Sequence, residues 1–541
     1  MNLPRMKYGS GLVRSQQVKF GGLNLTAGAA DGDLVDMWNM TSDHYPVLAT
    51  RPLRYQKSLL MATKDLFCRE ELYWIVDQQS GEGADLMRNY MTVGTVSKGL
   101  KTFGALGDWI IILPDKKAYN TVTGAFRDME SRWVGTMLDF RDGTLYGAAA
   151  TGNCIACPDV DWSAWFAPGD AVTVAGCTEH PENNGSRIIR QISGNEMYFY
   201  ENSFTVGTET GDMTISRTVP ELEHLCEHSN RLWGCAGNTI YASKLGDPFN
   251  WECYDGLESD SYALEVGSPG RFTGCISYGG YPTFFKEDMI YKVYGSYPSN
   301  FQVADSQSMG VAEGCHRSLA VAGEVLFYLS RSGVMAYTGG VPQLVSEDLG
   351  TEQFLCNAAG SDGQKYYISM RTRAGVGGLY VYDTRRGLWH REDDLDVVAF
   401  ARKGWDLYAL NRIGYVFLCG NHGTHEELDG KEMVKETLLP WRVDFADFTG
   451  NTTNQKGVTK LHIRLELEEN AICQVSVMYD SDGTLHRVRE IIGDGVKQSY
   501  YLPLVVRRCD HFKLVISGIG GCKIHSLVKD VYVGSEIRGR N

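Results

Sequence analysis

The sequence predicts an all-β protein, and its composition, turn residues and short apolar runs all lead to this expectation. The chain has 541 residues, of which 61 are Gly, 29 are Tyr and only 15 are Pro. Gly permits the tight turns that join short strands, and Tyr is among the aromatic residues that favour strands. Hydrophobic residues make up 43% and charged residues 22%, which is typical of a globular protein and not of a disordered one.

A unit of short apolar strands joined by a turn with Gly, Asn or Asp recurs about every 40 to 50 residues, apart from one long gap. Examples lie at residues 104–124, 224–244, 274–295, 318–340 and 399–421. This is the period of four-stranded propeller blades. The sequence therefore predicts a β-propeller of about six or seven blades between residues 55 and 425.

Two stretches depart from the repeat. Residues 155–220 contain turn-bounded strands of their own, such as AVTVAGC, and predict an inserted small β-domain. The segment KLHIRLELE alternates, so that Leu461, Ile463, Leu465 and Leu467 face a core and predict a β-sandwich. The expected organisation is an N-terminal strap at 1–54, the first part of the propeller at 55–154, the inserted small β-domain at 155–220, the second part of the propeller at 221–425, a linker at 426–439, and a C-terminal β-sandwich at 440–541.

The segment from Phe20 to Arg54 predicts an extended strap. Small and acidic residues around 27–33 indicate an irregular loop, since they can bury little surface. Pro46 and Pro52 bracket a short extended piece that resembles an edge strand more than a helix. We expect this strap to lie along a larger β-structure.

Charge and targeting signals narrow the function classes. The formal net charge of −14 argues against a protein that coats nucleic acid, although it is compatible with one that lets DNA pass. No apolar run is long enough for a secretory core or a membrane-spanning helix, which predicts folding in a cytoplasm. The 14 cysteines are scattered singly, so in a reducing compartment we expect buried thiols that pack as small hydrophobes.

One group of residues has spacing compatible with a structural zinc site. Cys154 and Cys157 form a CxxC, and Cys177 and His180 follow about twenty residues later. The alternative is unligated thiols, because Cys177 ends the alternating strand AVTVAGC and the CxxC is more apolar than most zinc knuckles. We expect unligated thiols at these positions, and no cofactor.

Two further patterns predict turns and strands more readily than sites. Asp480, Asp482 and Gly483 resemble the first half of a calcium loop, but Ile491 stands where the loop needs a Glu, so we expect an Asp-Gly hairpin. Cys509, Asp510 and His511 are consecutive, and neighbours on a strand point to opposite faces, which argues against a catalytic triad.

The acidic run REDDLD at 391–396 is typical of a solvated turn. The Gly-rich AGVGG at 374–378 lacks the helix of a phosphate site and predicts a hairpin loop. With no catalytic constellation among these candidates, we expect that the protein is not an enzyme.

The strap and the repeats together resemble a known class of proteins. FGGLN, followed by a variable loop and MWNMTSDHYPVLATRP, precedes repeats such as those at 231–251, 284–295 and 326–340. This pattern resembles the tail nozzle and tail hub proteins of short-tailed bacteriophages, which are virion structural proteins.

The resemblance implies a non-enzymatic component of a virion tail, made in the cytoplasm of the host bacterium. It implies a homo-oligomeric ring, a hexamer, which docks below the portal and adaptor proteins and anchors tail fibres or receptor-binding proteins. Double-stranded DNA would pass through the ring during ejection. The strap would then be a clamp that closes the propeller or an arm that reaches a neighbour.

Two other functions remain open from the sequence. The first is a carbohydrate-binding or glycan-degrading β-propeller at a cell surface, in which aromatic residues such as Trp389 and Trp405 stack on sugars. The second is a cytosolic scaffold with no viral link.

Overall fold

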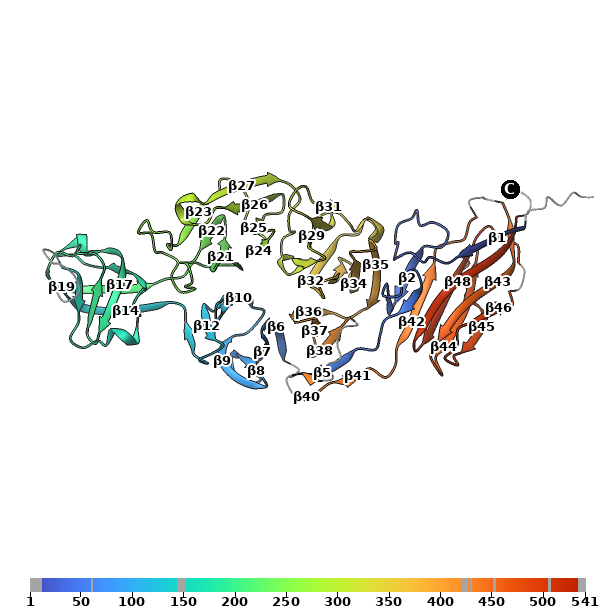
Figure 1. Ribbon diagram of the computed structural model, residues 1–541, viewed down its shortest axis with the longest axis horizontal. Coiled ribbons are helices and arrows are strands. Elements are labelled where there is room, and N and C mark those ends of the chain that lie inside the picture. Colours follow the sequence, from blue (N-terminus) through green and yellow to red (C-terminus); the bar gives the residue numbers. More distant parts are fainter. Residues whose placement is uncertain are drawn as a thin grey trace, which may run out of the picture. The chain divides into compact units, whose positions relative to one another are not determined.

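The computed structural model of the chain describes residues 12–59, 62–143, 152–420, 427–428, 431–450, 454–504 and 507–533 (Figure 1). The regular elements in these residues are β-strands and five single 3₁₀ turns, so the all-β expectation is confirmed. No helix in these ranges has the length and apolar character to cross a membrane. The 3₁₀ turns are η1 (Trp162–Ala164), η2 (Pro181–Asn183), η3 (Pro298–Asn300), η4 (His316–Ser318) and η5 (Glu347–Leu349).

The chain divides into two compact units, one formed by Met1–Leu72 with Arg317–Asn541 and the other by Tyr73–His316. In the second unit, outside an inserted barrel, antiparallel strands follow one another in chain order within each sheet, which is the arrangement of propeller blades. The strands are β7 (Glu71–Asp77), β8 (Gly83–Arg88) and β9 (Met91–Ser97); β10 (Thr102–Leu106), β11 (Trp109–Leu113), β12 (Lys117–Asn120) and β13 (Phe126–Asp128); β20 (His224–His228), β21 (Arg231–Ala236), β22 (Thr239–Ala242) and β23 (Tyr262–Glu265); and β24 (Gly274–Tyr278), β25 (Tyr281–Phe285), β26 (Met289–Tyr294) and β27 (Gln302–Gln307).

The first unit contains further sheets of the same kind, and one of them is completed by a strand from the N-terminal region. β5 pairs antiparallel with β38, so it becomes the fourth strand after β36, β37 and β38, and β41 pairs with its other edge. The strands are β5 (Tyr55–Ser58) and β6 (Thr63–Arg69); β28 (Ala320–Ala322), β29 (Val325–Ser330), β30 (Gly333–Tyr337) and β31 (Gln343–Leu344); β32 (Phe354–Ser361), β33 (Lys365–Thr372), β34 (Gly377–Asp383) and β35 (Leu388–Asp393); β36 (Val397–Lys403), β37 (Asp406–Asn411) and β38 (Tyr415–Cys419); and β39 (Glu427–Leu428), β40 (Lys431–Glu432) and β41 (Val434–Lys435).

The turn between β20 and β21 shows how the local sequence builds such a sheet. His228 pairs with Arg231, so only Ser229 and Asn230 form the turn. Both have positive φ, 49° and 56°, which gives a two-residue turn whose twist matches the flanking strands. The predicted fold class, a β-propeller with an inserted small β-domain and a C-terminal sandwich, is confirmed, and the number of blades stays a prediction.

The inserted domain is a closed barrel, and it begins earlier than expected. Its strands run in the order β14-β15-β18-β17-β16-β19, and β14 closes it by pairing with both β15 and β19. The barrel therefore spans Ser131 to Arg217, not 155–220, because β14 looks like a blade strand until its long-range partners are known. The strands are β14 (Ser131–Arg141), β15 (Cys154–Ala156), β16 (Ala171–Ala175), β17 (Gly185–Ser193), β18 (Glu196–Phe199) and β19 (Gly207–Arg217).

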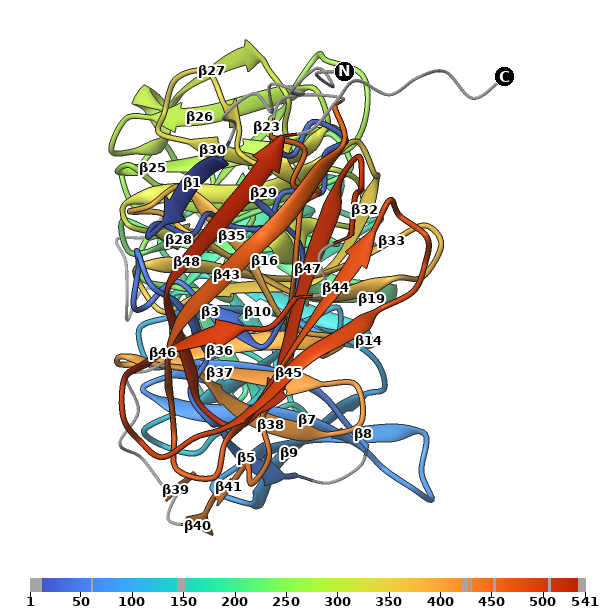
Figure 2. The same cartoon turned by 90° about the vertical axis from the view of Figure 1, so that its right-hand side faces the viewer.

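The C-terminal region forms a sandwich of two sheets, of which one faces the viewer in Figure 2. Leu461, Ile463, Leu465 and Leu467 of β43 are all buried, which confirms the alternation read from the sequence. One sheet has the order β3-β4-β48-β43-β46 with β1 on β48, and the other has the order β2-β42-β47-β44-β45. The strands contributed by the C-terminal region are β42 (Pro440–Phe445), β43 (Lys456–Leu467), β44 (Ile472–Tyr479), β45 (His486–Ile492), β46 (Gln498–Leu502), β47 (Phe512–Ile519) and β48 (Cys522–Val533).

The N-terminal segment is not a separate strap, because its described part forms strands of the sandwich. β1 and β4 pair with β48, and β2 pairs with β42, so this segment contributes to both sheets. The expected linker at 426–439 also contains strand structure, since β39 pairs with β40 and β41 pairs with β5. The N-terminal strands are β1 (Leu12–Gln17), β2 (Leu34–Trp38), β3 (Met40–Thr41) and β4 (Leu48–Thr50).

Replacement of Trp162 should weaken the barrel specifically. Trp162 is buried in the barrel core, where its ring packs edge-to-face on Trp133 at 5.1 Å. We expect Trp162→Ala to lower the free energy of opening of the barrel by about 3–5 kcal/mol, measured by amide hydrogen exchange over 131–217. Trp165→Ala is the matched control, because that side chain is 41% exposed and its loss should change protection little. Equal effects of the two substitutions would contradict this account of the core.

Candidate functional site

The four zinc candidates lie in or beside the barrel but do not form a ligand set. Cys157 and Cys177 belong to the barrel core, as does Ile155. Cys154 precedes Ile155 on β15 and is outside that core cluster, because neighbours on a strand point to opposite faces. Within the described residues no group of three or more His, Cys, Asp or Glu side chains could hold a metal ion.

The thiols of two of these candidates lie in poorly solvated surroundings. Burial raises the pKa of Cys154 to about 12 and that of Cys177 to about 11. The His180 backbone N–H donates to Glu209, and its ring Nδ1 lies 3.6 Å from Glu182. All 14 cysteines are free, and 11 of them are buried, as expected of small hydrophobic residues.

The calcium-like residues stabilise a turn. Asp480 Oδ1 accepts the backbone N–H of Asp510 at 2.6 Å, and Asp482 Oδ1 accepts that of Thr484 at 2.9 Å. Ile491 is buried on β45, which pairs with β44 across this turn. The hairpin expected from the sequence is therefore confirmed, but its tight turn is formed by Asp480 and Ser481, both with positive φ, and is closed by the N–H of Asp482 on the carbonyl of Tyr479, one turn before the predicted Asp482-Gly483.

Of the consecutive Cys509, Asp510 and His511, only Cys509 lies apart from the other two, because Asp510 and His511 stay in contact. His511 also has a partner that the sequence did not indicate. Cys509 is buried, whereas His511 Nε2 lies 2.8 Å from Ser481 Oγ and its Nδ1 lies 3.3 Å from Asp510 Oδ2. Ser481 is exposed in the β44–β45 turn. This contact holds that turn against the start of β47, and none of the four residues lines the pocket described below.

The two tryptophans considered for sugar stacking differ in environment. Trp389 is buried and donates its indole N–H to the carbonyl of Val345 at 2.7 Å, so it packs the sheet and cannot stack on a sugar. Trp405 is 69% exposed at the turn between β36 and β37.

The acidic run at 391–396 is not a solvated turn throughout, because two of its carboxylates are buried in a cluster of ion pairs. Arg54 pairs with Glu392 and, at 2.5 Å, with Asp393, while Arg51 pairs with Glu436 at 2.7 Å. Arg51, Arg54, Glu392 and Asp393 are all buried. The sequence expectation was wrong here because the cationic partners lie more than 300 residues away in the chain.

This cluster connects three distant segments of the first unit. Arg51 and Arg54 come from the segment between β4 and β5, Glu392 and Asp393 end β35, and Glu436 follows β41. The backbone N–H of Arg54 also donates to Glu436 at 2.9 Å. Burial alone would lower the pKa of Arg54, but the carboxylates of Asp393 and Glu392 outweigh it and raise that pKa.

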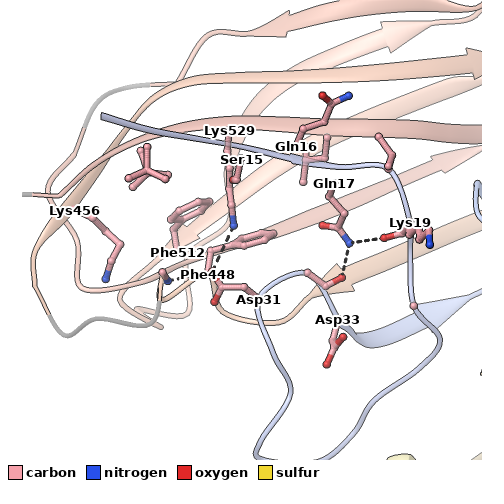
Figure 3. Close-up of a pocket in the computed structure, with 17 residues that line it drawn as sticks. Ser15, Gln16, Gln17, Lys19, Asp31, Asp33, Phe448, Lys456, Phe512 and Lys529 are labelled. Carbon is pink, nitrogen blue, oxygen red and sulfur yellow. Dashed lines mark hydrogen bonds and ion pairs between the residues drawn. The ribbon is translucent and has the colours of Figure 1, made fainter. Parts of the chain in front are cut away.

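A pocket of about 650 Å³ opens in the sandwich, between β1, β48 and the loops that carry Asp31 and Phe448 (Figure 3). Lys529 extends from β48 toward Asp31, with Nζ 3.5 Å from Oδ2 and 3.6 Å from the centroid of the Phe448 ring. Phe448 also stacks on Phe512 at 5.1 Å. The pocket thus combines a cation, a carboxylate and an aromatic wall, and no local pattern in the sequence indicates it.

Two other hollows are more polar. One of about 740 Å³ lies in the first unit, and Arg51, Glu466 and Lys523 are among its lining residues. The other, of about 1230 Å³, lies in the second unit between the barrel and the sheet of β10–β13, and Arg132 and Trp165 are among its lining residues.

No family model and no curated protein matches the chain. Among solved structures, BamB from Moraxella catarrhalis aligns with 13% identity and a TM-score of 0.35, covering 68% of this chain and 98% of BamB. The computationally designed Ika8 protein aligns with 12% identity and a TM-score of 0.33, over 67% of this chain and 97% of its own. An exo-beta-1,3-galactanase from Phanerochaete chrysosporium gives 8% identity and a TM-score of 0.21, over 57% and 95%. At these scores the similarities carry no argument about function, and the assignment of the fold depends on the sheets described above.

Loss of Arg54 should destabilise the first unit strongly. Arg54→Met keeps much of the side-chain volume but leaves Glu392 and Asp393 buried without their main cation. We expect a loss of about 3–5 kcal/mol in the free energy of unfolding, measured by urea denaturation. Arg412→Met is the control, since Arg412 and its partner Asp396 are 57% and 43% exposed, and its cost should stay within about 1 kcal/mol.

The same cluster should make stability sensitive to acid. Burial raises the pKa of Asp393, but Arg54 and Arg51 lower it more, so its folded pKa lies below the ordinary 3.8. The stabilisation is therefore complete above that ordinary value and is lost as pH falls below it. The difference in melting temperature between the wild type and Asp393→Asn should be large at pH 7 and should shrink progressively as pH is lowered below 3.8. A difference that does not change with pH would contradict this assignment.

Proposed function

We propose that this protein is a non-enzymatic structural component of a bacteriophage tail, a nozzle or hub subunit that forms a ring-shaped DNA conduit. The proposed ring is a hexamer located in the virion tail below the portal and adaptor proteins. It would anchor fibres or receptor-binding proteins and would be made in the host bacterial cytoplasm. The resemblance of the strap and repeats to such proteins motivates the proposal.

One structural observation supports it above the others: both described ends of the chain lie in one sandwich that is joined to a propeller sheet by buried charges. β1 and β48 pair along six residues, from Leu12 with Tyr532 to Gln17 with Leu527. Arg54 then connects the segment that follows β4 to the end of β35. A subunit of a conduit transmits force between its neighbours. A unit whose distant segments are held together by strand pairing and buried ion pairs resists such force.

The charge of the chain is compatible with the passage of DNA. A net charge of −14 disfavours lasting contact with phosphate, so a lumen lined by part of this charge would let a duplex slide. The proposed ring needs only heterologous contacts between identical wedge-shaped subunits.

The decisive experiment measures assembly. Mass photometry of the full-length protein, alone and after addition of a purified portal–adaptor complex, should show particles of six chains, and negative-stain images should show closed rings with a central channel. A stable monomer under both conditions would overturn the proposal. Arg412→Met, which should leave the fold intact, provides a control for nonspecific loss of assembly.

A second candidate function is carbohydrate binding, and exposed Trp405 favours it. An exposed indole offers the flat apolar face on which sugar rings stack. Binding of the intact protein to host surface polysaccharide should then be weakened at least tenfold by Trp405→Ala and not by Trp165→Ala. Polysaccharide binding that is equal in all three proteins, or absent, would exclude Trp405 as a sugar platform.

A further inference from the structure

In the sandwich pocket, a lysine occupies a position on the inner face of β48 where an apolar residue is expected. Leu527, Lys529 and Val531 alternate along β48, so all three point to the pocket side of the sheet. Leu527 and Val531 match the expectation for an inner face. Lys529 does not, and its side chain is only 15% exposed.

The ammonium group of Lys529 is incompletely satisfied. Its one carboxylate neighbour is Asp31, at 3.5 Å, and among the described residues it makes no hydrogen bond to a backbone carbonyl or hydroxyl. Asp31 already accepts the N–H groups of Thr449 and Gly450 at 2.9 and 3.0 Å. Burial lowers the pKa of Lys529 more than Asp31 raises it, so the cation is poorly solvated. An additional anion would supply the ammonium group of Lys529 with a further hydrogen-bond acceptor and a balancing charge.

The rest of the pocket is suited to a ring. Val13 stands opposite Val531 across the β1–β48 pair, and Ser15 stands opposite Lys529, which places the Ser15 hydroxyl on the same side of the sheet as the lysine side chain. Phe512 adds aromatic surface. A volume of about 650 Å³ lies within the range of small-molecule sites, which are mostly apolar with a few placed polar groups.

The charged residues that line the pocket favour an anion over a cation. Three lysines line the pocket, Lys19, Lys456 and Lys529, against two carboxylates, Asp31 and Asp33. Because the whole chain carries −14, this local excess of positive charge runs against the overall charge.

We propose that this pocket binds a small monoanion with an apolar ring, such as an aromatic or alicyclic carboxylate, sulfonate or sulfate. The anionic group contacts Lys529 and the Ser15 hydroxyl, and the ring packs against Val13, Val531 and Phe512. Neither the proposed ring assembly nor the proposed binding to polysaccharide requires this site.

A matched pair of fluorescent probes tests the proposal on the full-length protein. 8-Anilinonaphthalene-1-sulfonate carries a sulfonate, and N-phenyl-1-naphthylamine has the same aromatic body without it. Both should bind, and Lys529→Met should weaken the sulfonate at least tenfold while changing the neutral probe less than twofold. Lys523→Met is the control, because that lysine lies on the same strand, pairs with Glu466 and is outside this pocket.

A second variant locates the site without altering the charge. Val13 is 55% exposed on β1, so Val13→Trp can fill the pocket without disturbing a core and should weaken both probes at least tenfold, even if Lys529→Met fails to fold. Thermal melting of each variant verifies that it is folded. The proposal is overturned if the sulfonate does not bind at 1 mM, or if Val13→Trp leaves the binding of both probes unchanged.

Competition distinguishes the kind of ring. Cyclohexanecarboxylate should displace the sulfonate probe, and glucuronate, whose ring carries hydroxyl groups, should not. Displacement by glucuronate alone would contradict the apolar ring and assign the pocket to an acidic sugar.

Discussion

The burial of Arg54 constrains much of the first unit. A guanidinium away from water is tolerated only with carboxylates beside it, and Glu392 and Asp393 supply them, while Glu436 accepts the backbone N–H of Arg54. These carboxylates come from the end of β35 and from the segment after β41. The chain therefore has to bring three distant segments together, and this fixes where β5 enters the last propeller sheet of the unit and where the sandwich begins.

The pairing of β1 with β48 is related to the position of Arg51 and Arg54. Once Arg51 and Arg54 are fixed beside β35, the residues before them lie against the sandwich, where β1 and β4 extend one sheet and β2 extends the other. The N-terminal strands β1 and β4 thereby cover the edge of β48 that does not face β43. A unit built this way is compatible with the proposed structural role. The pocket beside β1 differs from the apolar core of the sandwich because it contains charged side chains.

The pocket and the ion-pair cluster differ in how completely neighbouring carboxylates balance the charge of their cation. Arg54 is surrounded by carboxylates, and its charge is matched within the fold. Lys529 faces a carboxylate already engaged by backbone N–H groups and the ring of Phe448. The carboxylates around Arg54 stabilise the structure, whereas Lys529 is the group to which the proposed anion binds.

The sequence by itself determined the features that depend on neighbouring residues: the all-β class, the alternation from Leu461 to Leu467, and the presence of a hairpin between β44 and β45. These are local because strand periodicity and turn conformation involve only a few consecutive residues. Only the tertiary structure decided that the barrel begins at Ser131, that the N-terminal segment joins the sandwich, that Glu392 and Asp393 are buried, and that Lys529 is partly buried. The physical reason is that strand pairing and charge burial depend on partners that lie tens to hundreds of residues away in the chain. The local sequence does not specify which of these partners a strand or a charged side chain contacts.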